Sequence, residues 1–169
     1  MRHMKIIIRV PNWIGDSILS VPAIKSLSKN FPEAQIWIAA NEWVRELFQS
    51  FDFIEGFVPL PPSNKLKDLK SSVKKIKKHR FDAGLLMTNS FASALLFSLA
   101  KIPERWGYSR DGRSILLTNG VSSQTQGPFI HQVDYYRDLI KKLGFKVYPS
   151  ELFLPLKAED KKESEKILD

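Results

Sequence analysis

The sequence of 169 residues contains no cysteine, which excludes both a disulfide framework and a metal site built from thiolates. Its three histidines, His3, His79 and His131, are scattered along the chain, so no zinc site is expected. The sequence also lacks an apolar run of the roughly 20 residues that a membrane span needs. Near the start, only three isoleucines stand between Lys5 and Arg9, which is too few for a signal-peptide core. We therefore expect a cytoplasmic protein without a metal ion.

Positive charge is plentiful but concentrated in one segment. The formal net charge is +8, and residues 65–80 hold seven lysines and one arginine against one aspartate. Apolar spacing in this segment predicts a helix with one stripe facing a core and lysines on the other faces. The segment lacks interleaved aromatic and base-reading side chains, so nucleic acid is not the expected partner. Its lysines are either a solvated face or a surface attracted to another anionic partner.

Short apolar runs alternate with longer amphipathic segments. The predicted strands cover residues 5–10, 35–39, 54–58, 82–87 and 105–108. The predicted helices cover residues 16–30, 42–51, 65–79, 90–100 and 133–143. Such alternation predicts an α/β fold, with a parallel sheet covered by helices on both faces. The fourth helix is apolar nearly all round and is expected to be buried. Residues 109–127 are expected to form a long loop or an irregular hairpin.

The junction between the first strand and the first helix reads Pro-Asn-Trp-Ile-Gly-Asp, from Pro11 to Asp16. Ligands bind at such junctions in open α/β sheets. Gly15 permits a tight turn or a close approach to the backbone, and Asp16 lies where the helix dipole favours an anion. Asp16 is therefore either a helix cap or a base, and Pro22 predicts a kink after the first turn. The glycine fingerprints of dinucleotide-binding and P-loop sites are absent.

Four stretches carry a resemblance to a known family. They read PNWIGDSILSVPAIKSL (11–27), FPEAQIWIAANEWVRELF (31–48), LLMTNSFASALLFSLAKIPERWGY (85–108) and HQVDYYRDLI (131–140). In this order they resemble the N-terminal region of the bacterial ADP-heptose:lipopolysaccharide heptosyltransferases. The Pro-x-Trp-Ile-Gly-Asp form is more similar to heptosyltransferase II than to heptosyltransferase I.

The resemblance implies a GT-B type glycosyltransferase, in which two Rossmann-like domains face each other across a cleft. It implies inverting transfer of heptose from ADP-heptose to the inner core of lipopolysaccharide, with no metal ion or further cofactor. Residues 1–156 would then be the acceptor-binding N-terminal domain, and 157–169 the truncated start of the linker and donor-binding domain. This fragment alone is expected to be inactive. The enzyme would work in the cytoplasm, at the periphery of the inner membrane.

The same resemblance makes Asp16 the catalytic base, which takes the proton of an acceptor hydroxyl. The predicted substrate contacts follow two strands or lie in the loose loop: Asn12, Trp13, Gly15, Ser17, Thr88, Asn89, Ser90, Arg110 and Arg113. For Trp13 the alternative is a buried aromatic, for residues 88–90 a helix cap, and for the two arginines solvated loop charges. We expect His131 to form a structural hydrogen bond at a helix start.

The lysine segment gains a specific interpretation from the resemblance. An anionic inner leaflet would carry the lipid-linked acceptor and attract a polybasic element. The lysines expected to face it are Lys70, Lys74, Lys75, Lys77 and Lys78. A function of another class also stays open, in which the chain is a basic Rossmann-like module that binds nucleic acid or a nucleotide.

Overall fold

The computed structural model describes residues 3–62, 66–123, 131–149 and 155. Within these residues six parallel strands form one sheet in the order β3-β2-β1-β4-β5-β6. Their bounds are β1 Lys5–Arg9, β2 Gln35–Asn41, β3 Gly56–Leu60, β4 Ala83–Leu86, β5 Glu104–Tyr108 and β6 Asn119–Val121. This order is that of a Rossmann-like sheet, in which the strand sequence reverses between β1 and β4. The predicted fold class is confirmed.

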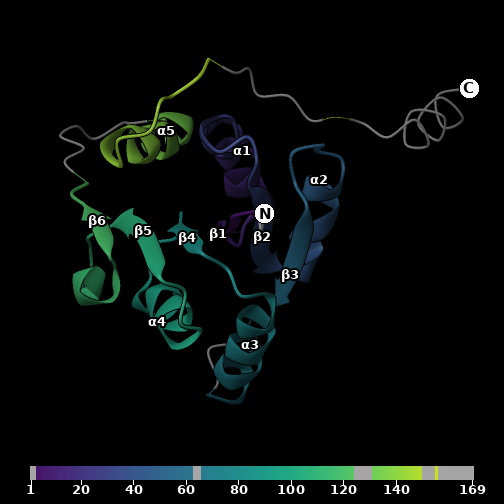
Figure 1. The fold of residues 1–169 in the computed structure, drawn as a ribbon, viewed down its shortest axis with the longest axis vertical. Coiled ribbons are helices and arrows are strands. Elements are labelled where there is room, and N and C mark those ends of the chain that lie inside the picture. Colours follow the sequence, from purple (N-terminus) through teal and green to yellow (C-terminus); the bar gives the residue numbers. More distant parts are fainter. Residues whose placement is uncertain (1–2, 63–65, 124–130, 150–154, 156–169) are drawn as a thin grey trace, which may run out of the picture.

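Helices cover both faces of the sheet. Their bounds are α1 Ile14–Asn30, η1 Glu42–Val44, α2 Arg45–Gln49, α3 Leu66–His79, α4 Phe91–Leu99, η2 Arg113–Leu116 and α5 Gln132–Lys142. Figure 1 shows α1 and α5 side by side on one face, with α3 and α4 on the other. The sheet is therefore buried between two layers of helices.

The central strand explains how one short segment serves two cores. Ile6, Ile7 and Ile8 are all fully buried. Because successive side chains of a strand point to opposite faces, Ile6 and Ile8 belong to the core under α1 and α5. Ile7 belongs to the core under α3 and α4. An uninterrupted apolar run is therefore the pattern that a strand covered on both faces requires.

Two edge strands differ from the prediction. β3 begins at Gly56, two residues later than predicted, and includes Pro59. Proline has no N–H for the ladder, but β3 pairs with β2 on one side only, and edge strands tolerate proline. β6 lies inside the segment expected to be irregular, and it pairs in parallel with β5. Its three residues are too few to show a periodic pattern.

Two helices also differ from expectation. α1 runs from Ile14 to Asn30 as a single helix that contains Pro22, so the helix is not interrupted after its first turn. α4 is not buried on all sides, since Phe91 is 45% and Leu99 47% exposed. Helix α4 thus carries more apolar side chains than its buried side holds. The predicted boundary at residues 156/157 lies outside the described residues and stays a prediction.

Candidate active site at the switch point of the sheet

The reversal of strand order places two loops next to each other. β1 and β4 are neighbours, and the backbone N–H of Met87 donates to the carbonyl of Arg9 at 3.0 Å. The chain leaves β1 for α1 on one face, and it leaves β4 for α4 on the opposite face. Residues 10–16 and 87–90 therefore meet at the carboxyl edge of the sheet, where open α/β sheets bind ligands. The expectation that these two segments are adjacent is confirmed.

The loop after β1 is held by its own hydrogen bonds. The hydroxyl of Ser17, which is fully buried, donates to the carbonyl of Pro11 at 3.0 Å. The indole N–H of Trp43 donates to the carbonyl of Asn12 at 3.0 Å. These bonds fix the loop while the side chain of Trp13 remains 77% exposed. The buried-aromatic interpretation of Trp13 is therefore wrong, and Ser17 acts on the shape of the loop.

Asp16 does not cap its helix. The N-cap of α1 is Trp13, no side chain caps it, and Asp16 is the third helical residue. Its side chain is partly exposed, and no described residue hydrogen-bonds to its carboxylate. The first-turn position places the negative charge near the positive end of the helix dipole. The carboxylate is therefore available to a ligand, whereas the carboxylate of a helix cap would be occupied by backbone N–H groups.

Gly15 has a different role from a turn former. It lies inside α1, and no heavy atom would come within 4 Å of an added Cβ. The fold itself does not require glycine here, either for backbone conformation or for space. What the missing side chain provides is open space beside Asp16, on the exposed side of the helix start.

One tyrosine of α5, Tyr136, lies in the surroundings of Asp16. Burial raises the pKa of Tyr136 to about 12, and the Asp16 carboxylate adds to this rise. The side-chain amide of Gln132 donates to the Tyr136 hydroxyl at 2.9 Å. The phenol thus stays protonated beside a negative charge. Sequence reasoning had assigned no function to Tyr135 or Tyr136, although the paired tyrosines in the first turn of a predicted helix were a visible signal.

The loop after β4 divides its roles between neighbouring residues. Ser90 caps α4, since its hydroxyl accepts a hydrogen bond from the N–H of Ser93 at 3.3 Å. The side-chain amide of Asn89 instead donates to the Tyr135 hydroxyl at 2.7 Å. The Thr88 hydroxyl and the Asn89 side-chain carbonyl are buried without a described partner. Buried polar atoms without a partner cost about 1–3 kcal/mol each, so these atoms need a water or a ligand.

Arg113 is the largest departure from expectation. It is fully buried, and two of its donors are satisfied by backbone carbonyls: Nε donates to Tyr108 at 2.8 Å and Nη1 to Thr88. Burial lowers the pKa of its guanidinium. The solvated-charge interpretation is therefore wrong for Arg113, which ties the end of β5 to the loop after β4. Its Nη2 has no described partner. Arg110, by contrast, is exposed.

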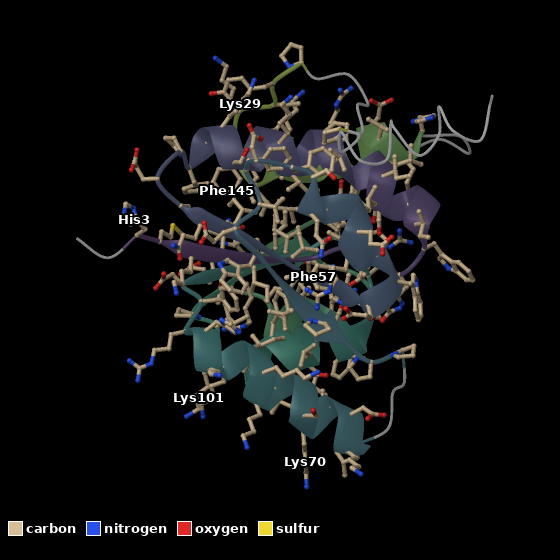
Figure 2. All side chains as sticks on the ribbon, turned by 90° about the vertical axis from the view of Figure 1, so that its right-hand side faces the viewer. His3, Lys29, Phe57, Lys70, Lys101 and Phe145 are labelled. Atoms are coloured by element: carbon tan, nitrogen blue, oxygen red, sulfur yellow. The ribbon has the colours of Figure 1, made fainter. Side chains whose placement is uncertain are left out.

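His131 begins helix α5, and the lysine helix α3 presents its lysines to solvent. His131 is the N-cap of α5, and its Nδ1 accepts from the N–H of Val133 at 3.3 Å, which confirms the structural hydrogen bond. α3 buries Ser72 and Ile76. Figure 2 shows Lys70 pointing away from the body of the protein. The five predicted surface lysines of α3 are all exposed: Lys70, Lys74, Lys75, Lys77 and Lys78.

Two searches of the described ranges concern metals and membranes. No group of three or more His, Asp or Glu side chains in residues 3–62, 66–123 and 131–149 could hold a metal ion. In the same part of the chain, every helix is too short or too polar to cross a membrane.

Curated relatives are heptosyltransferases of type 2. Lipopolysaccharide heptosyltransferase 2 of Escherichia coli K12 is 29% identical over 119 residues, which cover 69% of this chain and 34% of the relative. Lipooligosaccharide heptosyltransferase 2 of Haemophilus ducreyi is 27% identical over 131 residues, which cover 76% of this chain and 38% of the relative. The chain thus spans little more than a third of the length of these relatives.

Solved structures and a family model agree with these relatives. The structure of E. coli ADP-heptose lipopolysaccharide heptosyltransferase II matches with a TM-score of 0.73 and 25% identity, over 98% of this chain and 50% of that one. A glycosyltransferase family 9 structure from Veillonella parvula shares the fold, with a TM-score of 0.82 and 16% identity over 96% of this chain and 48% of that one. The model of glycosyltransferase family 9 (heptosyltransferase) matches residues 69–169, more than half of the chain. This chain belongs to that family.

Proposed function

We propose that this chain is the acceptor-binding half of a heptosyltransferase that moves heptose from ADP-heptose to the inner core of lipopolysaccharide. The observation that carries the proposal is the carboxylate of Asp16, which lies at the switch point of the sheet without a described hydrogen-bond partner. In this proposal residues 1–156 receive the acceptor, and the donor is bound by sequence that begins within 157–169. Family membership and the resemblance to heptosyltransferase II support this division.

The proposed reaction is one inverting displacement. Asp16 accepts the proton of an acceptor hydroxyl as that oxygen attacks the anomeric carbon of the heptose. The bond between the anomeric carbon and the diphosphate oxygen breaks, and ADP leaves with the electron pair. The proposal includes no metal ion or cofactor beyond the sugar-nucleotide donor. Tyr136, whose pKa is raised by burial and by the Asp16 carboxylate, stays protonated near that carboxylate.

The acceptor is positioned by the two loops. Trp13 offers an exposed aromatic face on which a sugar ring can stack, and Gly15 leaves space for the sugar beside Asp16. Asn12, Thr88, Asn89 and Ser90 supply hydroxyl and amide groups that suit sugar hydroxyls.

Arginines and buried groups act around these loops. Arg110 is exposed and available to an anionic group on the acceptor. Ser17 and Arg113 act indirectly, because each holds a loop from a fully buried position. The exposed lysines of α3 draw the enzyme to the anionic inner surface of the membrane, where the lipid-linked acceptor resides. Nucleic acid has no part in this proposal.

The decisive test is Asp16→Asn in the full-length enzyme. Asparagine keeps the shape of the side chain but removes the proton acceptor, so kcat should fall roughly 10²- to 10⁴-fold. Acceptor binding and the melting temperature should change little. Transfer is measured by ADP release with purified acceptor saccharide.

Asp134→Asn is the matched control, because Asp134 is also the third residue of a helix and carries a first-turn carboxylate. It should leave kcat unchanged. Near-normal turnover of the Asp16→Asn enzyme would refute the assigned base. Absence of heptosyl transfer by the unmodified full-length enzyme would refute the proposed activity itself.

A further inference from the structure

Arg9 is a cation in an unusual environment. It ends β1, and enough protein surrounds its guanidinium that desolvation lowers its pKa to about 10. No carboxylate of the described residues forms an ion pair with it. Arg9 is partly exposed, but no counter-charge among the described residues offsets this desolvation. A bound anion would supply that counter-charge.

The hydrogen bonds of Arg9 are all to neutral groups. Nη1 donates to the carbonyls of Val10 at 2.6 Å and Ala39 at 3.3 Å, and Nη2 donates to the side-chain carbonyl of Asn12 at 2.5 Å. A guanidinium has five N–H groups, so these three bonds leave Nε–H and one N–H of Nη2 without a described partner. The bonds fix the orientation of the cation without neutralising it.

The guanidinium borders a cavity that has a second source of positive potential. The cavity measures about 250 Å³ and lies between α3, α4 and the end of β3. Its polar side chains include those of Arg9, Asn12, Ser90 and Ser93, with Ala92 beside them. The apolar part of its wall is formed by Leu60, Pro61, Leu69, Leu95 and Leu96. The Ser90 hydroxyl accepts from the N–H of Ser93. The N–H groups of Phe91 and Ala92, like those of any first helical turn, have no carbonyl within the helix to bind. The N-terminal end of this nine-residue helix, where its dipole is positive, thus borders the same cavity as Arg9 at Ser90 and Ala92.

We propose that this cavity is an oxyanion site, in which Arg9 and the N-terminus of α4 bind a carboxylate or phosphate group carried by the acceptor saccharide. The identity of the carrier rests on the proposed function, whereas anion binding does not. Arg9 is then a specificity-determining residue: it holds the acidic group at the α4 side of the switch point. One carboxylate, Asp68, also lines the cavity and opposes the anion.

The site is tested first on the chain itself. Inorganic phosphate, glucuronate and glucose are titrated while nuclear magnetic resonance follows the Nε–H of Arg9 and the backbone amides of residues 91 and 92. Phosphate and glucuronate should shift these signals saturably, and the neutral sugar should not. Arg9→Gln should weaken anion binding roughly 10- to 100-fold. Lys101→Gln, which removes an equal charge at the opposite end of α4, should leave affinity within about twofold.

Asp68→Asn supplies an independent variant that leaves Arg9 in place. It should tighten anion binding severalfold, and an unchanged affinity would contradict the site even if Arg9→Gln failed to fold. Absence of saturable shifts, or equal weakening by Lys101→Gln, would also overturn the proposal. In the full-length enzyme, Arg9→Gln should raise the KM for an acidic acceptor at least tenfold with little change in kcat.

The two levels of the proposal fail in different ways. Anion binding at Arg9 in a full-length protein that transfers no heptose would keep the oxyanion site and refute the proposed function. Heptosyl transfer with an unchanged acceptor KM in Arg9→Gln would refute the role of the site and keep the function.

Discussion

Gly15→Ala separates the needs of the fold from the needs of the ligand at one position. Gly15 is the second residue of α1, and no atom would come within 4 Å of the new methyl group. Alanine reduces the conformational freedom of the unfolded chain and has the higher helix propensity. The unfolding free energy should therefore rise by about 0.4–1 kcal/mol, and the melting temperature by about 1–4 °C.

The same substitution should impair transfer. The methyl group would occupy the open space beside Asp16, where the proposed acceptor approaches. Displacement of a reacting group by about 1 Å can cost 10²-fold, so kcat/KM for the acceptor should fall roughly 10- to 100-fold. Urea denaturation of the chain and steady-state kinetics of the full-length enzyme measure the two effects. A variant that is both more stable and less active is the expected outcome.

Gly144→Ala is the control with the opposite profile. Gly144 also has open space around it, but its φ of +87° lies in the left-handed region. Alanine there is strained and should destabilise the chain by about 1 kcal/mol without altering kcat/KM. Full activity of Gly15→Ala would refute the idea that the open space at Gly15 serves a ligand. A loss of stability at Gly15 would refute the physical argument for its tolerance.

Two further predictions concern α3. Glutamine at four exposed lysines should leave the melting temperature unchanged, since Ile76 and Ser72 form the buried side of the helix. It should weaken binding to anionic vesicles by roughly 1 kcal/mol per lysine, and unchanged vesicle binding would favour the solvated-face interpretation. The four lysines are Lys70, Lys74, Lys75 and Lys78. Burial, with the charges of Lys5 and Lys78, lowers the pKa of His79 below its usual 6.5, so the unfolded state binds more protons and stability should fall as pH drops below about 6.5. His79→Gln should flatten this part of the profile of unfolding free energy against pH, and an identical slope would contradict the assignment.

Much of the fold was predictable because the central strands are uninterrupted apolar runs. A run such as Ile6–Ile8, buried on both faces, has few other interpretations. From strand–helix alternation and a doubly wound order, it followed that the junction at Asp16 and residues 88–90 lie at the same edge of the sheet. β6 was missed because its pairing depends on β5, and a three-residue strand containing Gly120 carries no periodic signal of its own.

The candidate site was less predictable because its contacts are made across long sequence separations. The hydrogen bond from Asn89 to Tyr135 joins residues 46 positions apart, and neither residue type indicates in the sequence which partner it will have. Arg113 looked like a loop charge because arginine is rarely fully buried. Its burial depends on two backbone carbonyls, of Tyr108 and Thr88, that become available only when the strands end side by side. The unusual environment of Arg9 likewise arises from the packing around it.

The two outer strands of the sheet limit how the protein can grow. A sheet edge is a row of unsatisfied backbone groups that recruits further strands unless something blocks it. Here one edge carries Pro59, which lacks a donor, and the other is the three-residue β6. Neither offers a long template for another chain. Under the proposed two-domain arrangement, a second strand-rich unit would therefore form a sheet of its own rather than extend this one.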